Sequence, residues 1–424
     1  MAETRKRILI ITSSPPFPLI SGGYQAQFHF IGELLKEMDV SVCFEVNDQN
    51  YSGYTELLKI WEGATFYPLF NIRQKKTLLY FYRWIKSVIR NFKREILLLF
   101  KSQLVQIEDS IKYQSFIHQP IFPQNARIVD HVAGILSENQ FDVIQIDFIS
   151  LAPLVYILPE DAVRILVHHE IRYIRIQREM DLFKNVDAFD LCRFGAIKDE
   201  EITLLKKFTK IITLTEKDKE ILSLDIPPEK IYASPATISQ EKTKEGPYIP
   251  FINKLVFIGS SNHLPNADGL EWFIDQVLPE VEEQIPDIRL EIIGRWDKHF
   301  IKIYHRKNIN FLGYIKDLNT AFSSSVLIVP IRIGSGMRLK IIEAINHKVP
   351  FITTNIGVEG LNFENDIDCI IADSPSGFAK GIHYLSENPA KQQVLISNAS
   401  EKLSKEYSYE EAIKKRLDFY KSLI

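Results

Sequence analysis

Cysteine is scarce in this 424-residue chain, and long uninterrupted apolar runs are missing. The three cysteines, Cys43, Cys192 and Cys369, are far apart and odd in number, which argues against a disulfide or metal framework and favours a reducing compartment. Residues 8–32 lack full charges, but prolines and glycines interrupt them, so they do not predict a membrane span. A strand pattern begins at residue 7, so we expect no cleaved signal peptide and a cytoplasmic protein.

A strong charge imbalance is also missing. The formal net charge is −3, which argues against a nucleic-acid binder that works by bulk electrostatics. Apolar residues make up 46% of the chain and charged residues 25%, as in ordinary soluble globular proteins. The chain is too long for one hydrophobic core, so we expect two domains.

Short apolar runs alternate with helical patterns along the whole chain. Most of the runs are fully apolar, as expected for strands that are covered on both faces, so the sequence predicts an α/β fold with parallel, doubly wound sheets. The predicted strands are 7–12, 40–46, 142–147, 163–168, 210–215, 254–259, 288–293, 309–312, 326–330, 350–354 and 369–372, and the predicted helices include 24–37, 127–139, 196–209, 267–284 and 336–346.

A polar segment broken by glycine and proline separates the two sets of strands. Residues 241–250 are therefore the predicted linker between an N-terminal domain, 1–240, and a C-terminal domain, 251–404. Residues 405–424 follow the last predicted strand and have an amphipathic helical pattern.

The segment Gly334-Ser-Gly-Met-Arg-Leu-Lys-Ile-Ile-Glu343 reads as a glycine loop that leads into a helix. Glycines leave backbone N–H groups open to close approach, and a helix N-terminus favours anions. Arg338 and Lys340 add positive charge at that end, which costs stability unless an anion binds there. Glu343 lies one turn after Lys340. The pattern predicts a site for a phosphate and a hydroxylated sugar.

Several segments together are similar to one family, and the chain resembles a GT-B glycosyltransferase of the large retaining family 4. The likeness is strong over most of 250–400 and weak over the first 240 residues. It is carried by the motifs Gly259-Ser-Ser-Asn-His-Leu-Pro-Asn-Ala-Asp-Gly-Leu-Glu-Trp-Phe273, Leu290-Glu-Ile-Ile-Gly294, Ile309-Asn-Phe-Leu-Gly-Tyr314, the segment 334–343, Gly357-Val-Glu-Gly360 and the pair Gly22-Gly23.

The resemblance implies two Rossmann-like domains that face a central cleft. A nucleotide-sugar donor would bind mainly to the C-terminal domain, a hydroxyl acceptor mainly to the N-terminal domain, and the last helix would cross back to the first domain. No metal cofactor is implied, in agreement with the lack of an evident Asp-x-Asp pair for Mg²⁺.

The resemblance also assigns roles to single residues. Lys340 and Arg338 would bind the diphosphate and stabilise its growing charge in the transition state, and Glu343 would bind the ribose hydroxyls. The alternative for each is a solvated helix residue or, for Glu343, an ion pair with Lys340. Gly336 and Met337 belong to the same donor loop. Ser335 stands where the family has a glutamate that faces the transferred sugar. Its hydroxyl can still hydrogen-bond a sugar hydroxyl as part of the donor site, but it carries no charge, so the identity of the sugar does not carry over.

Other predicted contacts come from outside that loop. His168 ends a predicted strand at the cleft, where the family has a histidine near the reacting carbon; His169 is the alternative, and a structural histidine is the ordinary reading. Gly22 and Gly23 would let the backbone approach the diphosphate, or would be simple turn glycines. Arg295 and Tyr314 would flank the nucleotide base, or would be surface residues.

A basic, aromatic insert lies at about 73–120. Residues 73–101 hold nine Lys/Arg against one acid, Glu95, with a helical spacing of charges and apolar residues. Such a helix is typical of binding to an anionic membrane surface, where each basic residue contributes about 1 kcal/mol. A lipid-linked acceptor would then suit the protein, although the same pattern fits a helix that packs on the N-terminal domain.

Three classes of function remain open from the sequence. The leading one is a metal-independent, retaining transfer of a sugar from a nucleotide donor to a polysaccharide, glycolipid or glycoprotein glycan. A GT-B epimerase would act on a nucleotide sugar without an acceptor. The third class is a non-catalytic protein that binds a transferase. Ser335 in place of the glutamate slightly favours this class, and the presence of Lys340, Glu343 and His168 argues against it.

Overall fold

The computed structural model describes residues 5–19, 22–71, 125–182, 186–236, 253–315 and 317–424. The basic segment 73–101 and the linker 241–250 lie outside these residues, so the membrane association expected of the first remains a prediction. None of the helices in the described part of the chain combines the length and apolarity that a membrane crossing requires.

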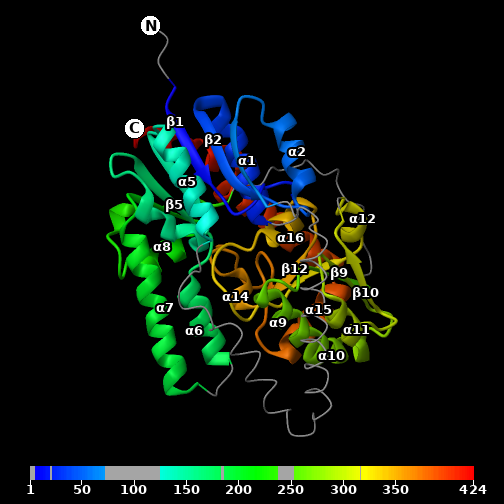
Figure 1. Cartoon of the computed structure of the whole chain (residues 1–424). Helices are drawn as coiled ribbons and strands as arrows, with labels where there is room; N and C mark the ends of the chain where they lie inside the picture. The colour runs from blue at the N-terminus through cyan, green and yellow to red at the C-terminus, as the bar shows by residue number, and fades with distance from the viewer. Residues whose placement is uncertain (1–4, 20–21, 72–124, 183–185, 237–252, 316) are drawn as a thin grey trace, which may run out of the picture.

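The N-terminal domain is a seven-stranded parallel sheet with helices on both faces (Figure 1). Its strand order is β3-β2-β1-β4-β5-β6-β7. The strands are β1 Arg7–Ile11, β2 Asp39–Val46, β3 Thr65–Phe70, β4 Val143–Asp147, β5 Val163–His168, β6 Lys210–Thr213 and β7 Ile231–Ala233. The helices are α1 Gly22–Glu37, α2 Tyr51–Ile60, α5 Ala126–Glu138, η2 Ile149–Ile157, α6 Arg172–Leu182, α7 Ala188–Lys206, α8 Glu216–Leu222 and η3 Pro228–Lys230.

The C-terminal domain repeats this plan with six parallel strands. Their order is β10-β9-β8-β11-β12-β13. The strands are β8 Lys254–Ile258, β9 Arg289–Ile293, β10 Ile309–Gly313, β11 Val326–Val329, β12 Phe351–Thr353 and β13 Ile370–Ile371. The helices are α9 Leu264–Trp272, the π-helix η4 Phe273–Val277, α10 Leu278–Gln284, α11 Lys298–Tyr304, α12 Asn319–Phe322, α13 Leu339–Asn346, α14 Asn355–Val358, α15 Pro375–Glu387, α16 Pro389–Glu406 and α17 Tyr409–Lys421.

The predicted fold class, two doubly wound α/β domains, is confirmed by these two sheets. The sequence pattern did not predict strands β3 and β7, which lie at the two edges of the first sheet. Strand β3 contains Pro68, which an edge strand tolerates because one side of its backbone has no partner. Strand β7 has three residues, too few for a recognisable pattern. The predicted helix at 336–346 begins later, at Leu339, because Gly334 and Gly336 have positive φ angles of 115° and 80°.

In each sheet the strand order reverses at one point. In open α/β sheets of this kind, ligands bind at this switch point, beside the carboxyl ends of the strands. In the first sheet this switch point lies between β1 and β4, and in the second between β8 and β11. The loops that leave the two switch points contact each other across the domain interface. A Cβ atom on Gly22, at the start of α1, would lie only 2.6 Å from Cδ1 of Leu339, the first residue of α13. The fold therefore brings the two expected binding edges together.

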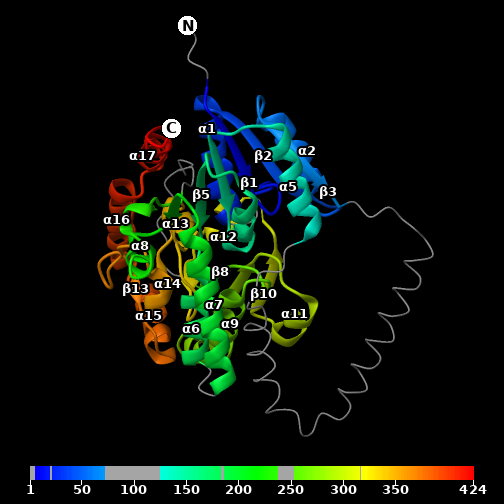
Figure 2. The same ribbon diagram turned by 60° about the vertical axis from the view of Figure 1, so that its left-hand side comes forward.

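The last helix, α17, lies against the N-terminal domain rather than the domain that precedes it (Figure 2). Tyr420 is fully buried, and its ring centroid is 5.3 Å from that of Phe30 on α1. Phe419 stacks on Tyr232 of β7 at 4.1 Å. The amphipathic pattern of this segment thus buries its apolar face on a helix and a strand that lie far away in the sequence.

Replacement of Tyr420 by alanine tests this docking. We expect Tyr420→Ala to lower the free energy of unfolding by about 3–5 kcal/mol, because it leaves a cavity the size of an aromatic ring. The matched variant Lys414→Ala, on the exposed side of the same helix, should change it by less than about 0.5 kcal/mol. Urea unfolding measures both, and equal values for the two variants would contradict the packing described here.

Candidate active site at the domain interface

The loop between β11 and α13 lies in close contact with the N-terminal domain. A Cβ atom on Gly336 would lie 2.3 Å from the carbonyl oxygen of His169, and the φ angle of Gly336 is also one that side chains rarely adopt. Only glycine fits this position. The predicted donor loop is therefore pressed against the turn that follows β5.

Arg338 folds its guanidinium back over this loop. Its Nη1 donates to the carbonyl oxygen of Gly336 at 2.8 Å and to that of Ser335. Its Nη2 is buried and has no hydrogen-bond partner among the described residues. Burial lowers the pKa of Arg338, while the carboxylates of Glu170 and Glu359 oppose that shift. The guanidinium is thus partly satisfied and keeps one buried donor for another group.

Lys340 is a half-buried lysine in the first turn of α13. Its Nζ donates to Oδ1 of Asn266 at 2.8 Å and lies 4.8 Å from the ring centroid of Phe257. Within the described residues, no carboxylate lies within ion-pair distance of it. Burial, and then the nearby charge of Arg338, lower its pKa to about 7. The site therefore holds a cation whose charge the carboxylate of Glu343 offsets only in part, as expected of a position that binds an anion.

Glu343 reaches across the domain interface. Its Oε1 accepts a hydrogen bond of 2.7 Å from Nε2 of Gln25 on α1, and burial raises its pKa. A carboxylate held by a neutral amide keeps acceptor capacity for hydroxyl groups, as its predicted role at the ribose requires. Gln25 was not predicted from the sequence, because nothing in the residues around a helical glutamine indicates a contact with another domain.

Ser335 is used differently from the prediction. It is buried, its Oγ accepts from the backbone N–H of Ile171 at 2.6 Å, and its hydroxyl donates to the Ile171 carbonyl oxygen at 3.3 Å. In this conformation the hydroxyl joins the two domains and does not face open space. The expected contact with a sugar hydroxyl would first require these bonds to open. Met337, placed in the same predicted donor loop, is buried in the apolar core.

The orientation of His168 also differs from the prediction. It is fully buried, and its Nε2 lies 2.9 Å from Oε1 of Glu201 on α7. Glu201 also accepts from the backbone N–H groups of Arg172 and Tyr173, so the pair ties β5 and the start of α6 to α7. His168 therefore does not face the cleft. The reason is the alternation along an extended strand, which turns this residue toward α7 and its neighbour the other way.

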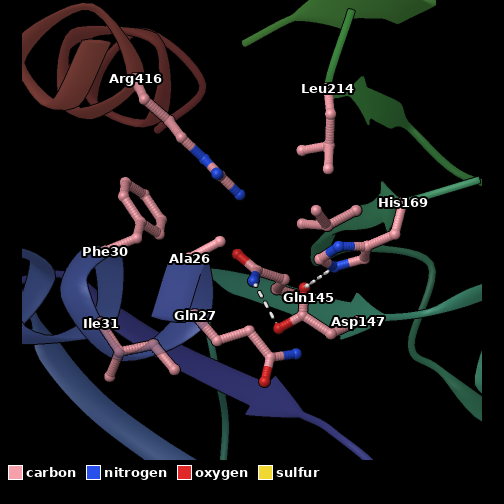
Figure 3. Close-up of a pocket in the computed structure, with 10 residues that line it drawn as sticks. Ala26, Gln27, Phe30, Ile31, Gln145, Asp147, His169, Leu214 and Arg416 are labelled. Carbon is pink, nitrogen blue, oxygen red and sulfur yellow. Dashed lines mark hydrogen bonds and ion pairs between the residues drawn. The ribbon is translucent and has the colours of Figure 1, made fainter. Parts of the chain in front are cut away.

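His169 is the histidine at the interface. Its ring stacks on that of Phe148, with centroids 4.2 Å apart, and its Nε2 lies 3.7 Å from Oδ1 of Asp147. Figure 3 shows its ring in a pocket that Gln27, Gln145, Asp147 and Arg416 also line. Phe148 has a φ angle of 72°, a strained conformation for a residue with a side chain, and such strain gathers at functional positions. A sequence signal was available for Asp147, an acid at the end of a buried apolar strand.

The remaining predicted residues lie around this centre. Gly22 and Gly23 are the first residues of α1, where Gly22 faces Leu339 and Gly23 faces the ring of Phe148. Arg295 and Tyr314 follow the carboxyl ends of β9 and β10 and are exposed. They lie on the edge of the C-terminal sheet where a base would be expected, so their role at the base remains a prediction.

An ion pair that the sequence did not predict clamps the two domains. Arg178 of α6 binds Glu359 at 2.8 Å through Nη2, with a second contact through Nη1, which also donates to the carbonyl oxygen of Gly334. Glu359 belongs to the motif Gly357-Val-Glu-Gly360, which was recognised in the sequence. Nothing in the sequence indicated its partner, Arg178. Among the residues that the structure describes, no group of three or more His, Cys, Asp or Glu residues could hold a metal ion.

The low pKa of Lys340 makes a prediction about stability. Unfolding restores the ordinary pKa of this lysine, so its burial disfavours the folded state most at pH 6 and least near pH 10. We expect Lys340→Met to raise the free energy of unfolding by about 1–2 kcal/mol at pH 6, with a gain that shrinks as pH rises. Urea unfolding at several pH values measures it, with the exposed Lys302→Met as control. A loss of stability at pH 6 would contradict the account.

Comparison with known proteins agrees with this geometry. Residues 252–388, which include the β11–α13 loop, match the family model described as Glycosyl transferases group 1. A protein from Klebsiella pneumoniae, described as an uncharacterized 44.6 kDa protein in the cps region, is 28% identical over 163 residues. That match covers 36% of this chain and 42% of the relative, so the chain matches less than half of the relative's length.

Solved structures resemble the whole chain. Anabaena HepE, in complex with UDP and glucose, superposes with a TM-score of 0.65 at 13% identity, over 98% of this chain and all of that one. TarM, from S. aureus, gives 0.67 at 13% identity and 98% of both chains. Sucrose-phosphate synthase from Thermosynechococcus elongatus gives 0.65 at 12% identity and 99% of both. These likenesses show a GT-B fold.

Proposed function

We propose that this protein transfers a sugar from a nucleotide-sugar donor to a hydroxyl acceptor, with retention of configuration and without a metal ion. The observation that carries the proposal is the poorly compensated positive charge of Lys340, together with the unpartnered Nη2 of Arg338, beside the β11–α13 loop. It lies where the switch points of two doubly wound sheets meet. The match of this domain to the family of group 1 glycosyl transferases supports the same reading.

The diphosphate of the donor would occupy the cationic position. The anomeric carbon exchanges its bond to a diphosphate oxygen for a bond to the acceptor hydroxyl oxygen, and the departing diphosphate takes the hydroxyl proton. Negative charge grows on the leaving group in this step, so cations already held in place stabilise the transition state more than the ground state. Lys340 would leave Asn266 for a phosphate oxygen, and the free Nη2 of Arg338 supplies a second donor.

The other residues divide the donor between them. Glu343 would accept from the ribose hydroxyls, and the base would lie toward Arg295 and Tyr314. The sugar would lie near His169, which replaces His168 in this role because only His169 faces the interface. HepE is described in complex with UDP and with UDP-glucose, and UDP is present in a TarM complex, so UDP-sugars are the first donors to test. A polysaccharide, a glycolipid or a glycoprotein glycan remains the proposed acceptor.

Release of nucleotide from a panel of nucleotide sugars tests the activity. We expect Lys340→Ala to reduce kcat by about 100- to 1,000-fold, because it removes a charge from the transition state. Glu343→Ala should mainly raise the KM for the donor, because the ribose does not react. The exposed variant Lys302→Ala of the same domain is the matched control.

The products separate the candidate functions. A transferase releases nucleotide and forms a glycoside with an added acceptor, whereas an epimerase changes the sugar without an acceptor. If no donor is turned over and none raises the Tm of the wild-type protein, the chain does not bind a nucleotide sugar and the proposal fails.

Donor binding should depend on pH through Lys340. Its pKa is about 7 in the free protein, and a bound diphosphate raises that value, so binding takes up a proton above pH 7. We expect the affinity for a nucleotide sugar to fall by up to about tenfold per pH unit above pH 7 and to stay level below it. Calorimetry in two buffers of different ionisation enthalpy measures the proton. Lys340→Arg, which stays charged, should remove this dependence, and an equal dependence in both proteins would assign it to another group.

A further inference from the structure

Strand β4 carries two polar side chains where a central buried strand is expected to be apolar. Gln145 and Asp147 are each 1% exposed, and they alternate with Ile144 and Ile146. Alternate residues of a strand share a face, so both polar groups point toward α1 and α17. Burial of an amide and a carboxylate costs free energy unless partners satisfy them, so this pair requires an explanation.

Helix α17 supplies a hydrogen-bond partner for Gln145. The hydroxyl of Tyr420 donates to Oε1 of Gln145, and Nε2 of Gln145 donates to Oδ2 of Asp147 at 3.1 Å. The other carboxylate oxygen of Asp147 lies 3.7 Å from Nε2 of His169, as the dashed line in Figure 3 shows. We name these four residues, Tyr420, Gln145, Asp147 and His169, the Tyr420 relay. It runs from the C-terminal helix to the histidine at the domain interface.

The relay has a fixed direction. Burial raises the pKa of Tyr420 to about 12, so its hydroxyl remains a donor at ordinary pH and holds the oxygen of the Gln145 amide toward α17. The amide nitrogen must then face Asp147. One carboxylate oxygen is thereby occupied, and the other is left for a ring N–H of His169. In this conformation Nε2 of His169 is buried, has no hydrogen-bond partner among the described residues and lies 3.7 Å from Oδ1 of Asp147. Once this contact tightens, Asp147 holds the proton on Nε2 and leaves Nδ1 as the free acceptor of the ring.

A second residue of α17 enters the same pocket. Arg416 lies one helical turn before Tyr420, is buried, and has its guanidinium 4.0 Å from the ring centroid of Phe30. Figure 3 shows the guanidinium pointing into the pocket that Gln145, Asp147 and His169 line. A cation in the same pocket as a buried carboxylate offsets part of the cost of that charge. The helix therefore brings both a directed donor and a positive charge to the relay.

We propose that Tyr420 and Gln145 are positioning residues, which orient Asp147 and through it the His169 ring toward the sugar of the donor. The inference rests on the proposed function, because it takes His169 to be the histidine at the sugar. The distance of 3.7 Å is longer than a hydrogen bond, and such contacts often tighten only when substrate binds. The C-terminal helix is then part of the active site and not only a strap between the domains.

A double-mutant cycle tests the relay through activity. Tyr420→Phe removes only the hydroxyl, and we expect it to lower kcat three- to tenfold with little change in the KM for the donor or in Tm. Asp147→Asn should lower kcat further, and adding Tyr420→Phe to it should have no additional effect, since both act on His169 by one route. The control Phe419→Leu weakens the docking on Tyr232 and the edge-to-face contact with the Tyr420 ring, but it removes no polar group of the relay, so its effect should simply add to that of Asp147→Asn. The relay is refuted if the effect of Tyr420→Phe on kcat adds to that of Asp147→Asn, or if Tyr420→Phe and Phe419→Leu lower kcat to the same extent.

A second measurement does not depend on activity. The ring ¹⁵N signals of His169, assigned with His169→Gln, report which nitrogen carries the proton in the full-length protein. We expect the Nε2–H form in the wild type and in Phe419→Leu, and a shift toward mixed forms in Tyr420→Phe and Asp147→Asn. If the wild type turns over no donor, the proposed function fails while these signals still decide the relay. Signals that are the same in all four proteins would refute it.

Discussion

The close contact between the β11–α13 loop and the turn after β5 is the constraint on which the rest of the site depends. Gly336 lies against the backbone of His169, and the hydroxyl of Ser335 binds the backbone of Ile171. Arg178 adds an ion pair to Glu359 across the same seam. These contacts hold Arg338 and Lys340 in a half-buried position where their charges are poorly solvated. The same contacts place His169 next to the loop, so charge and histidine share one interface.

In the function we propose, the site gives up stability in favour of binding. A lysine whose pKa falls to about 7 is held against the preference of its charge for water, and no carboxylate among the described residues pairs with it. A polyanion relieves that cost only when it binds, which makes the cost part of the affinity and of transition-state stabilisation. Asn266 and the ring of Phe257 satisfy the lysine only weakly, so both are easily exchanged for phosphate oxygens.

Sequence patterns were sufficient for the fold but only in part for the site. Of the strands that the structure describes, apolar runs located all but β3 and β7, because edge strands are short or interrupted and carry a weak pattern. The position of Lys340 and Glu343 followed from a contiguous motif. His168 and Ser335 were assigned to the cleft by position, yet the side to which each points is set by contacts with Glu201 and Ile171, far away in the sequence. Gln25, Arg178 and Tyr420 were missed for the same reason, since each acts through a partner that only the folded chain supplies.

The central claim is that Lys340 and Arg338 form the place of a nucleotide diphosphate. A crystal structure of the protein with a UDP-sugar or UDP tests it directly. The account predicts diphosphate oxygens within about 3 Å of Nζ of Lys340, with its bond to Asn266 broken, and a further oxygen near Nη2 of Arg338. A nucleotide bound elsewhere, or one bound here while Lys340 remains on Asn266, would contradict it.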